Sequence, residues 1–157
     1  MVKTNVMSDE LNELLDTALY REIASEAFYT ASQKTTSDSG AIALMKELAA
    51  EEKLHLRRLK ILKTKGLNKS GFRVKDLHDL RLSDYLTGGV TIEGAGLQDT
   101  LIFAIKKERE AIDFYTNMMG VFREPAVKGL CLRLARAELA HKFELETLYD
   151  SLFYTEN

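Results

Sequence analysis

Apolar residues recur every three or four positions along most of this chain, in four long segments. That period is typical of α-helices with one buried face. It predicts helices from about Ser8 to Lys34, from Ser39 to just before Gly66, from Leu97 to Met119, where Gly120 stops the helix, and from Pro125 to about Tyr154. A single proline and an abundance of Ala, Leu, Glu and Lys also favour an all-α fold.

The connections between the predicted helices differ in length. Residues 35–38 and 121–124 are short loops, so each flanking pair of helices should form an antiparallel hairpin. Residues 66–96 form a long, glycine-containing connection in which 74–86 has the pattern of a short helix. We expect one four-helix domain over residues 1–157, with hairpins at 8–65 and 97–155. The pattern leaves open whether the hairpins pair within one chain or exchange between two.

Composition narrows the class of protein. The net charge of −2 is spread over interspersed acidic and basic residues, so neither nucleic acid nor a membrane surface is expected as a partner. The single cysteine, Cys131, excludes an internal disulfide and an iron site held by four thiolates of this chain. The amino terminus has no apolar signal region and no segment has 18 uninterrupted apolar residues, so we expect a cytoplasmic protein.

The two predicted hairpins repeat one another without a gap, at an offset of 86 residues. Many matching positions are Leu or Ala, which any two helices facing one core could share. Three pairs of ionisable residues and one pair of tyrosines have no such packing reason: Glu22 with Glu108, Glu52 with Glu138, His55 with His141, and Tyr29 with Tyr115.

The repeated Glu and His residues interrupt the apolar stripes near the middle of every predicted helix. All six should therefore project into the bundle at one level: Glu22, Glu52, His55, Glu108, Glu138 and His141. Buried carboxylates are very costly unless they are paired or bind a metal, and two divalent cations would neutralise four of them. Oxygen and nitrogen ligands without a thiolate favour iron or manganese over structural zinc. The pattern predicts a binuclear metal site.

Each feature also has a simpler interpretation. A single Glu-x-x-His element would ordinarily lie on a solvated helix surface. Two such elements on core stripes, each with a partner glutamate at the same offset, argue against that interpretation. Tyr29 and Tyr115 could be core aromatics, but two turns after Glu22 and Glu108 we favour hydrogen bonds to metal-bound carboxylates. Four of the remaining candidates are interpreted as surface positions: Glu51, whose repeat partner is Ala137, and Glu26, Glu110 and His78. Cys131 is interpreted as a core residue.

Two repeated strings resemble the rubrerythrin-like branch of the ferritin-like superfamily. They are A-x-x-x-E-x-x-x-x-x-F-Y, at residues 18–29 and 104–115, and L-A-x-x-E-x-x-H, at residues 48–55 and 134–141. The resemblance covers both hairpins. It implies a ferritin-like four-helix bundle with a centre of two non-haem iron ions that reacts with hydrogen peroxide or dioxygen; manganese or a mixed pair of metals is also compatible with these ligands.

Two departures modify what the resemblance implies. The chain carries no rubredoxin-like Cys pairs, so an electron donor would be a separate protein. Peroxidase-type members have an extra carboxylate three residues after the ligand that corresponds to Glu108. This chain has Ala111 there, and the repeat equivalent is Ser25. The remaining set of four Glu and two His is closer to bacterioferritin-type sites.

The leading hypothesis is a homodimeric oxidoreductase that oxidises Fe(II) with hydrogen peroxide or dioxygen. Glu52 and Glu138 would bridge the metals, with Glu22 and His55 serving one metal and Glu108 and His141 the other. One alternative is a ferroxidase that feeds an iron-storage shell, for which a large cage would be required. Another is a helical interaction module whose metal is purely structural.

Overall fold

All four segments with the helical period are helices in the computed structural model, which describes residues 9–66, 96–123 and 125–154. The helices are α1 (Asp9–Ser32), α2 (Ser39–Gly66), α5 (Leu97–Val121) and α6 (Pro125–Phe153). The predicted short helix at 74–86, with His78, lies outside the described residues, as does Ser8.

Three helix ends differ from the prediction: α2 includes Gly66, α5 ends two residues later than expected and α1 ends two residues earlier. Gly120 does not stop α5, which continues to Val121 and ends where the Phe122 N–H donates to the Met118 carbonyl oxygen at 3.2 Å. A glycine costs only about 1 kcal/mol inside a helix, so it does not end one unless the chain beyond it also turns away. At the other hairpin, α1 ends at Ser32 because Lys34 and Thr35 donate to carbonyls three residues back, which tightens the chain into a turn.

Asp38 caps the start of α2: its Oδ1 accepts the Ala41 N–H at 2.8 Å. We expect Asp38→Ala to lower the free energy of unfolding by about 1 kcal/mol, because a backbone donor of the first turn loses its acceptor. This corresponds to a melting temperature about 2–4 °C lower for a chain of this size. Thermal denaturation followed by circular dichroism measures the change. Ser37→Ala, at the exposed neighbouring position, is the matched control, and equal losses in both variants would contradict the capping role.

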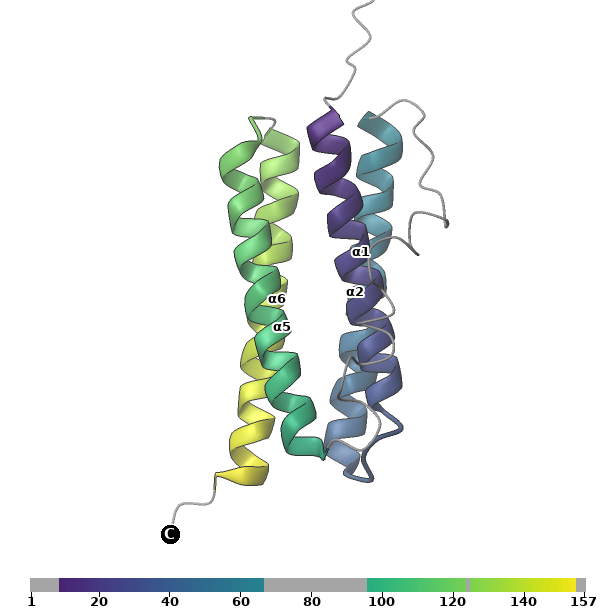
Figure 1. Cartoon of the computed structure of the whole chain (residues 1–157), viewed down its shortest axis with the longest axis vertical. Coiled ribbons are helices and arrows are strands. Elements are labelled where there is room, and N and C mark those ends of the chain that lie inside the picture. Colours follow the sequence, from purple (N-terminus) through teal and green to yellow (C-terminus); the bar gives the residue numbers. More distant parts are fainter. Residues whose placement is uncertain (1–8, 67–95, 124, 155–157) are drawn as a thin grey trace, which may run out of the picture.

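Helices α1 and α2 form one antiparallel hairpin and α5 and α6 form the other (Figure 1). The hairpins lie side by side, with α2 against α6 and α1 against α5. The expected all-α four-helix bundle of two hairpins is thus confirmed. Among the described helices, none combines the length and the apolarity that crossing a bilayer requires.

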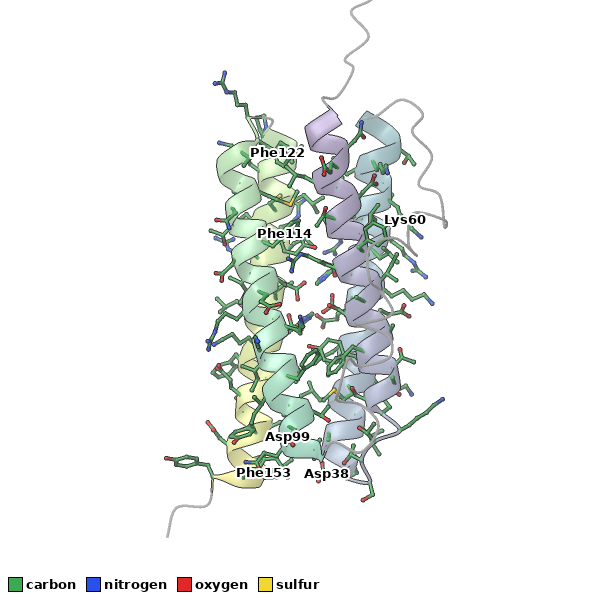
Figure 2. The ribbon with its side chains drawn as sticks, viewed as in Figure 1. Asp38, Lys60, Asp99, Phe114, Phe122 and Phe153 are labelled. Carbon is green, nitrogen blue, oxygen red and sulfur yellow. The ribbon has the colours of Figure 1, made fainter. Side chains whose placement is uncertain are left out.

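Side chains fill the space between the hairpins (Figure 2) and form two apolar clusters, one in each half of the bundle. Each cluster draws on all four helices, and the repeat exchanges them: Leu15 and Leu134 lie in one cluster, and their equivalents Leu101 and Leu48 lie in the other. The sequence repeat is therefore a structural repeat, because equal apolar stripes on paired helices pack in equal ways.

Candidate metal centre

The six repeated Glu and His residues converge between the two apolar clusters. Every helix contributes: α1 and α5 each supply one glutamate, and α2 and α6 each supply one Glu-x-x-His element. All six are buried, with between 1% and 3% of their surface exposed: Glu22, Glu52, His55, Glu108, Glu138 and His141. This places four carboxylates and two imidazoles in one water-poor compartment.

The cluster consists of two overlapping groups. Glu22, Glu52, His55 and Glu138 form one, and Glu52, Glu108, Glu138 and His141 form the other; in each, one donor atom per residue lies within 4.8 Å of all the others. Only Glu52 and Glu138 belong to both groups. They therefore occupy the positions expected of bridging ligands, while the other four residues each serve one side.

The imidazoles face these shared carboxylates through Nδ1. The Nδ1 atom of His55 lies 3.3 Å from Glu52 and 2.9 Å from Glu138, and also 3.3 Å from Glu22. The Nδ1 atom of His141 lies 3.2 Å from both Glu52 and Glu138. The two halves of the repeat therefore agree in this detail as well, because both histidines present Nδ1 to the shared carboxylates.

Tyr29 and Tyr115 hydrogen-bond to the carboxylates that serve one side each. The Tyr29 hydroxyl donates to Oε1 of Glu108, and the Tyr115 hydroxyl donates to Oε1 of Glu22. Each bond crosses from one hairpin to the other, so the tyrosine does not contact the glutamate of its own helix two turns earlier. Burial, and then the neighbouring carboxylates, raises the pKa of both phenols, which keeps them protonated as donors.

Glu51 was expected on a solvated face, and this expectation is wrong in part. Its side chain is 44% exposed, but its Oε2 lies 2.6 Å from Nε2 of His141. The repeat did not predict this contact, because the residue equivalent to Glu51 in the second half is Ala137, which has no carboxylate. A usable signal was nevertheless present, since a ligand imidazole needs an acceptor for its second nitrogen and Glu51 directly precedes Glu52.

The other candidates lie away from the cluster. Glu110 pairs with Lys107 at 3.1 Å in a partly exposed position, and Glu26 is half-buried on α1. Cys131 is a core residue, as expected, with 2% of its surface exposed. Burial raises the pKa of its thiol to about 11, which disfavours the reactive thiolate.

Two carboxylates and both imidazoles of the cluster have pKa values above the ordinary ones, so these groups hold their protons more tightly than free side chains do. Burial, followed by the charges of Glu22 and Glu138, raises the pKa of Glu52, and burial with the contact to Glu138 raises that of Glu108 to about 8. Burial alone would lower the pKa of His55, but contacts with Glu138, Glu22 and Glu52 outweigh it and raise the pKa to about 12. Bound protons thus supply the positive charge that the carboxylates require.

Four oxygen and nitrogen atoms of the cluster, each of a kind that binds metals, have no hydrogen-bond partner among the described residues. Both carboxylate oxygens of Glu52, Oε1 of Glu138 and Nδ1 of His141 are buried and make no hydrogen bond within the described residues, although the His–Glu contacts are at ion-pair distance. Buried polar atoms without partners are rare in proteins and call for an explanation. These atoms belong to residues of the two overlapping groups, whose clustered oxygens and nitrogens could bind metal ions.

We expect metal binding to release protons. Both imidazoles are expected to be protonated at pH 7, because burial lowers the pKa of each ring but the carboxylate contacts outweigh it, raising the pKa of His55 to about 12 and that of His141 above its ordinary value. A histidine ligand must be neutral, so filling both sides displaces about two protons or more. Affinity should therefore increase with pH. Calorimetric titration in two buffers of different ionisation enthalpy measures the release; identical heats in both buffers would contradict the prediction.

The fold and the cluster together define a four-helix bundle with a buried carboxylate–histidine cluster that could bind metal ions. Solved structures with a similar fold include the following two. A two-domain protein from Anabaena variabilis ATCC 29413, with DJ-1/ThiJ/PfpI-like and ferritin-like domains, matches with a TM-score of 0.74 and 17% identity, over 92% of this chain and 40% of that chain.

A hypothetical protein from Pyrococcus furiosus matches with a TM-score of 0.69 and 22% identity, over 94% of this chain and 92% of that chain. No protein-family model matches the sequence, and no curated protein does. The likeness to solved structures therefore concerns the fold alone, and the chemistry has to be argued from the residues of this chain.

Proposed function

We propose that this protein is a binuclear non-haem iron oxidoreductase of the rubrerythrin-like kind, which oxidises Fe(II) while it reduces hydrogen peroxide or dioxygen. The observation that carries the proposal is the pair of shared carboxylates, Glu52 and Glu138, each within 3.3 Å of both histidines. Two carboxylates common to two ligand groups suit two cations at bridging distance better than one cation or none.

Each residue has a distinct role in this proposal. Glu52 and Glu138 would bridge the metals, Glu22 and His55 would hold one, and Glu108 and His141 would hold the other. When bound, the metals supply electrons and bind the oxidant. The tyrosines orient the carboxylates of Glu22 and Glu108 and hold their own protons beside them. The apolar clusters on both sides keep bulk water from the reacting atoms.

Oxidation of iron for storage is the second candidate. Its support is the symmetry of the set of ligands, four glutamates and two histidines, together with Ala111 at the position of the extra carboxylate found in peroxidase-type members. The two functions differ in assembly: a redox enzyme is proposed to be a cytoplasmic homodimer served by a separate electron-donor protein, whereas storage requires a large cage. Size-exclusion chromatography with light scattering separates these alternatives.

Anaerobic loading with Fe(II) tests the proposal directly. We expect about two iron ions per chain and an absorption change on mixing with hydrogen peroxide or dioxygen, and stopped-flow rates with each oxidant would identify the preferred one. Iron uptake without any oxidant-dependent change would favour a structural metal, and absence of uptake would exclude the proposal. The same titration with Mn(II) shows whether manganese replaces iron.

A further inference from the structure

The repeat that relates the two sides of the metal centre is broken at one contact. The Nε2 atom of His141 lies 2.6 Å from Oε2 of Glu51. The residue equivalent to Glu51 in the second half is Ala137, which has no side-chain acceptor. Within the described chain, Nε2 of His55 makes no hydrogen bond and no ion pair. The two imidazoles are therefore alike at Nδ1, which faces the cluster of carboxylates, and different at Nε2.

The contact determines the hydrogen positions of His141. An ionised carboxylate only accepts hydrogen bonds, so Nε2 carries the hydrogen that is donated to Glu51. In the neutral ring Nδ1 is then the free acceptor, and Nδ1 is the atom that faces Glu52, Glu108 and Glu138. A charged acceptor on Nε2 also makes Nδ1 a stronger donor to a metal.

Glu51 is close to both imidazoles but bonds to only one of them. The rings of His55 and His141 are stacked, with centroids 5.6 Å apart and planes 14° from parallel. A carboxylate oxygen of Glu51 and a nitrogen of each ring lie within 4.8 Å of one another. The 2.6 Å distance to His141 is that of a short, charge-assisted hydrogen bond, whereas no hydrogen bond joins Glu51 to His55 among the described residues.

We propose that Glu51 is a positioning residue that makes the two metal positions unequal. The position served by Glu108 and His141 binds a divalent ion more tightly and fills first, while the position served by Glu22 and His55 fills second. This inference rests on the proposed binuclear site and adds an order of filling to it. Unequal positions would let the second ion be exchanged while the first one remains bound.

Anaerobic titration of the metal-free protein with Co(II), followed by visible absorption and calorimetry, tests the order of filling. We expect the wild type to bind two ions in two steps of different affinity. In Glu51→Ala the tighter step should weaken by roughly 10- to 100-fold, the typical effect of removing such a partner, so that the steps merge. Glu51→Gln, which keeps an acceptor without the charge, should lie between the two.

Two further variants show whether Glu51 acts through His141. Ala137→Glu restores the repeat and should tighten the weaker step, since it supplies an acceptor near Nε2 of His55. In a His141→Ala background, Glu51→Ala should have no additional effect on Co(II) affinity. Thermal denaturation of each metal-free variant checks folding, and the exposed substitution Glu47→Gln is the control for loss of a carboxylate on α2.

The outcomes distinguish failure of this inference from failure of the proposed function. Two equal steps in the wild type, or two unchanged steps in Glu51→Ala, would overturn the inference while leaving a binuclear site in place. An additional effect of Glu51→Ala without His141 would overturn the route through the imidazole. Absence of any Co(II) uptake by the wild type would overturn the proposed site together with the inference.

Discussion

Glu52→Ala is expected to abolish binuclear metal binding, lowering uptake from about two ions per chain to one or none. Glu52 is common to both ligand groups, and its carboxylate lies 3.3 Å from Nδ1 of His55 and 3.2 Å from Nδ1 of His141. Its loss therefore removes a ligand from each position at once. A residue that served one position alone would leave the other intact.

Metal content after anaerobic loading with Fe(II) and gel filtration measures this effect. Glu47→Gln, an exposed acidic position on the same helix, is the matched control and should retain wild-type uptake. Glu22→Ala should be intermediate, because Glu22 belongs to only one of the two groups. Unchanged stoichiometry in Glu52→Ala would mean that the metal binds elsewhere.

Removal of metal is expected to lower the melting temperature by roughly 5–10 °C. Saturation at one hundred times the dissociation constant stabilises a folded protein by about 2.7 kcal/mol. One kcal/mol corresponds to about 2–4 °C in a chain of this size. The stabilisation would arise at the centre of the bundle, where bound metal ions would replace protons among four buried carboxylates and link the α1–α2 hairpin to the α5–α6 hairpin.

Differential scanning calorimetry with Mn(II), and again after addition of a chelator, checks this prediction. Mn(II) avoids the oxidation that would complicate a scan with iron. The Glu52→Ala variant should lose most of the shift, which ties the stabilisation to the cluster. A shift of equal size in that variant would indicate that Mn(II) acts on the protein surface instead.

Most of the fold could be predicted because its determinants are local and repeated. Apolar spacing located all four described helices, and Pro125 marked the start of α6. The prediction at Gly120 failed, since a glycine weakens a helix without ending it, and the end of α5 depends on where the chain turns after Val121. Local composition indicates where a helix is able to end; packing decides where it does.

The candidate site was predictable to a similar degree. The central position of Glu22, Glu52, Glu108 and Glu138 on apolar stripes implied their convergence, because the helical period assigns each residue to a face. The sequence did not reveal which carboxylate each tyrosine contacts. Tyr29 bonds to Glu108, across the hairpins, since that contact depends on the lateral placement of α1 against α5.

The sequence by itself determined the helices, their pairing into two hairpins and the six polar residues of the centre, and it indicated Glu52 and Glu138 as the shared pair. Helical periodicity and a repeat without gaps are properties of residue order. Only the tertiary structure decided that Tyr29 and Tyr115 bond across the hairpins, and that Glu51 reaches Nε2 of His141 while no carboxylate of the described residues hydrogen-bonds to Nε2 of His55. The physical reason is that such contacts depend on how the two hairpins are rotated and shifted against each other, and this follows from the packing of all four helices together.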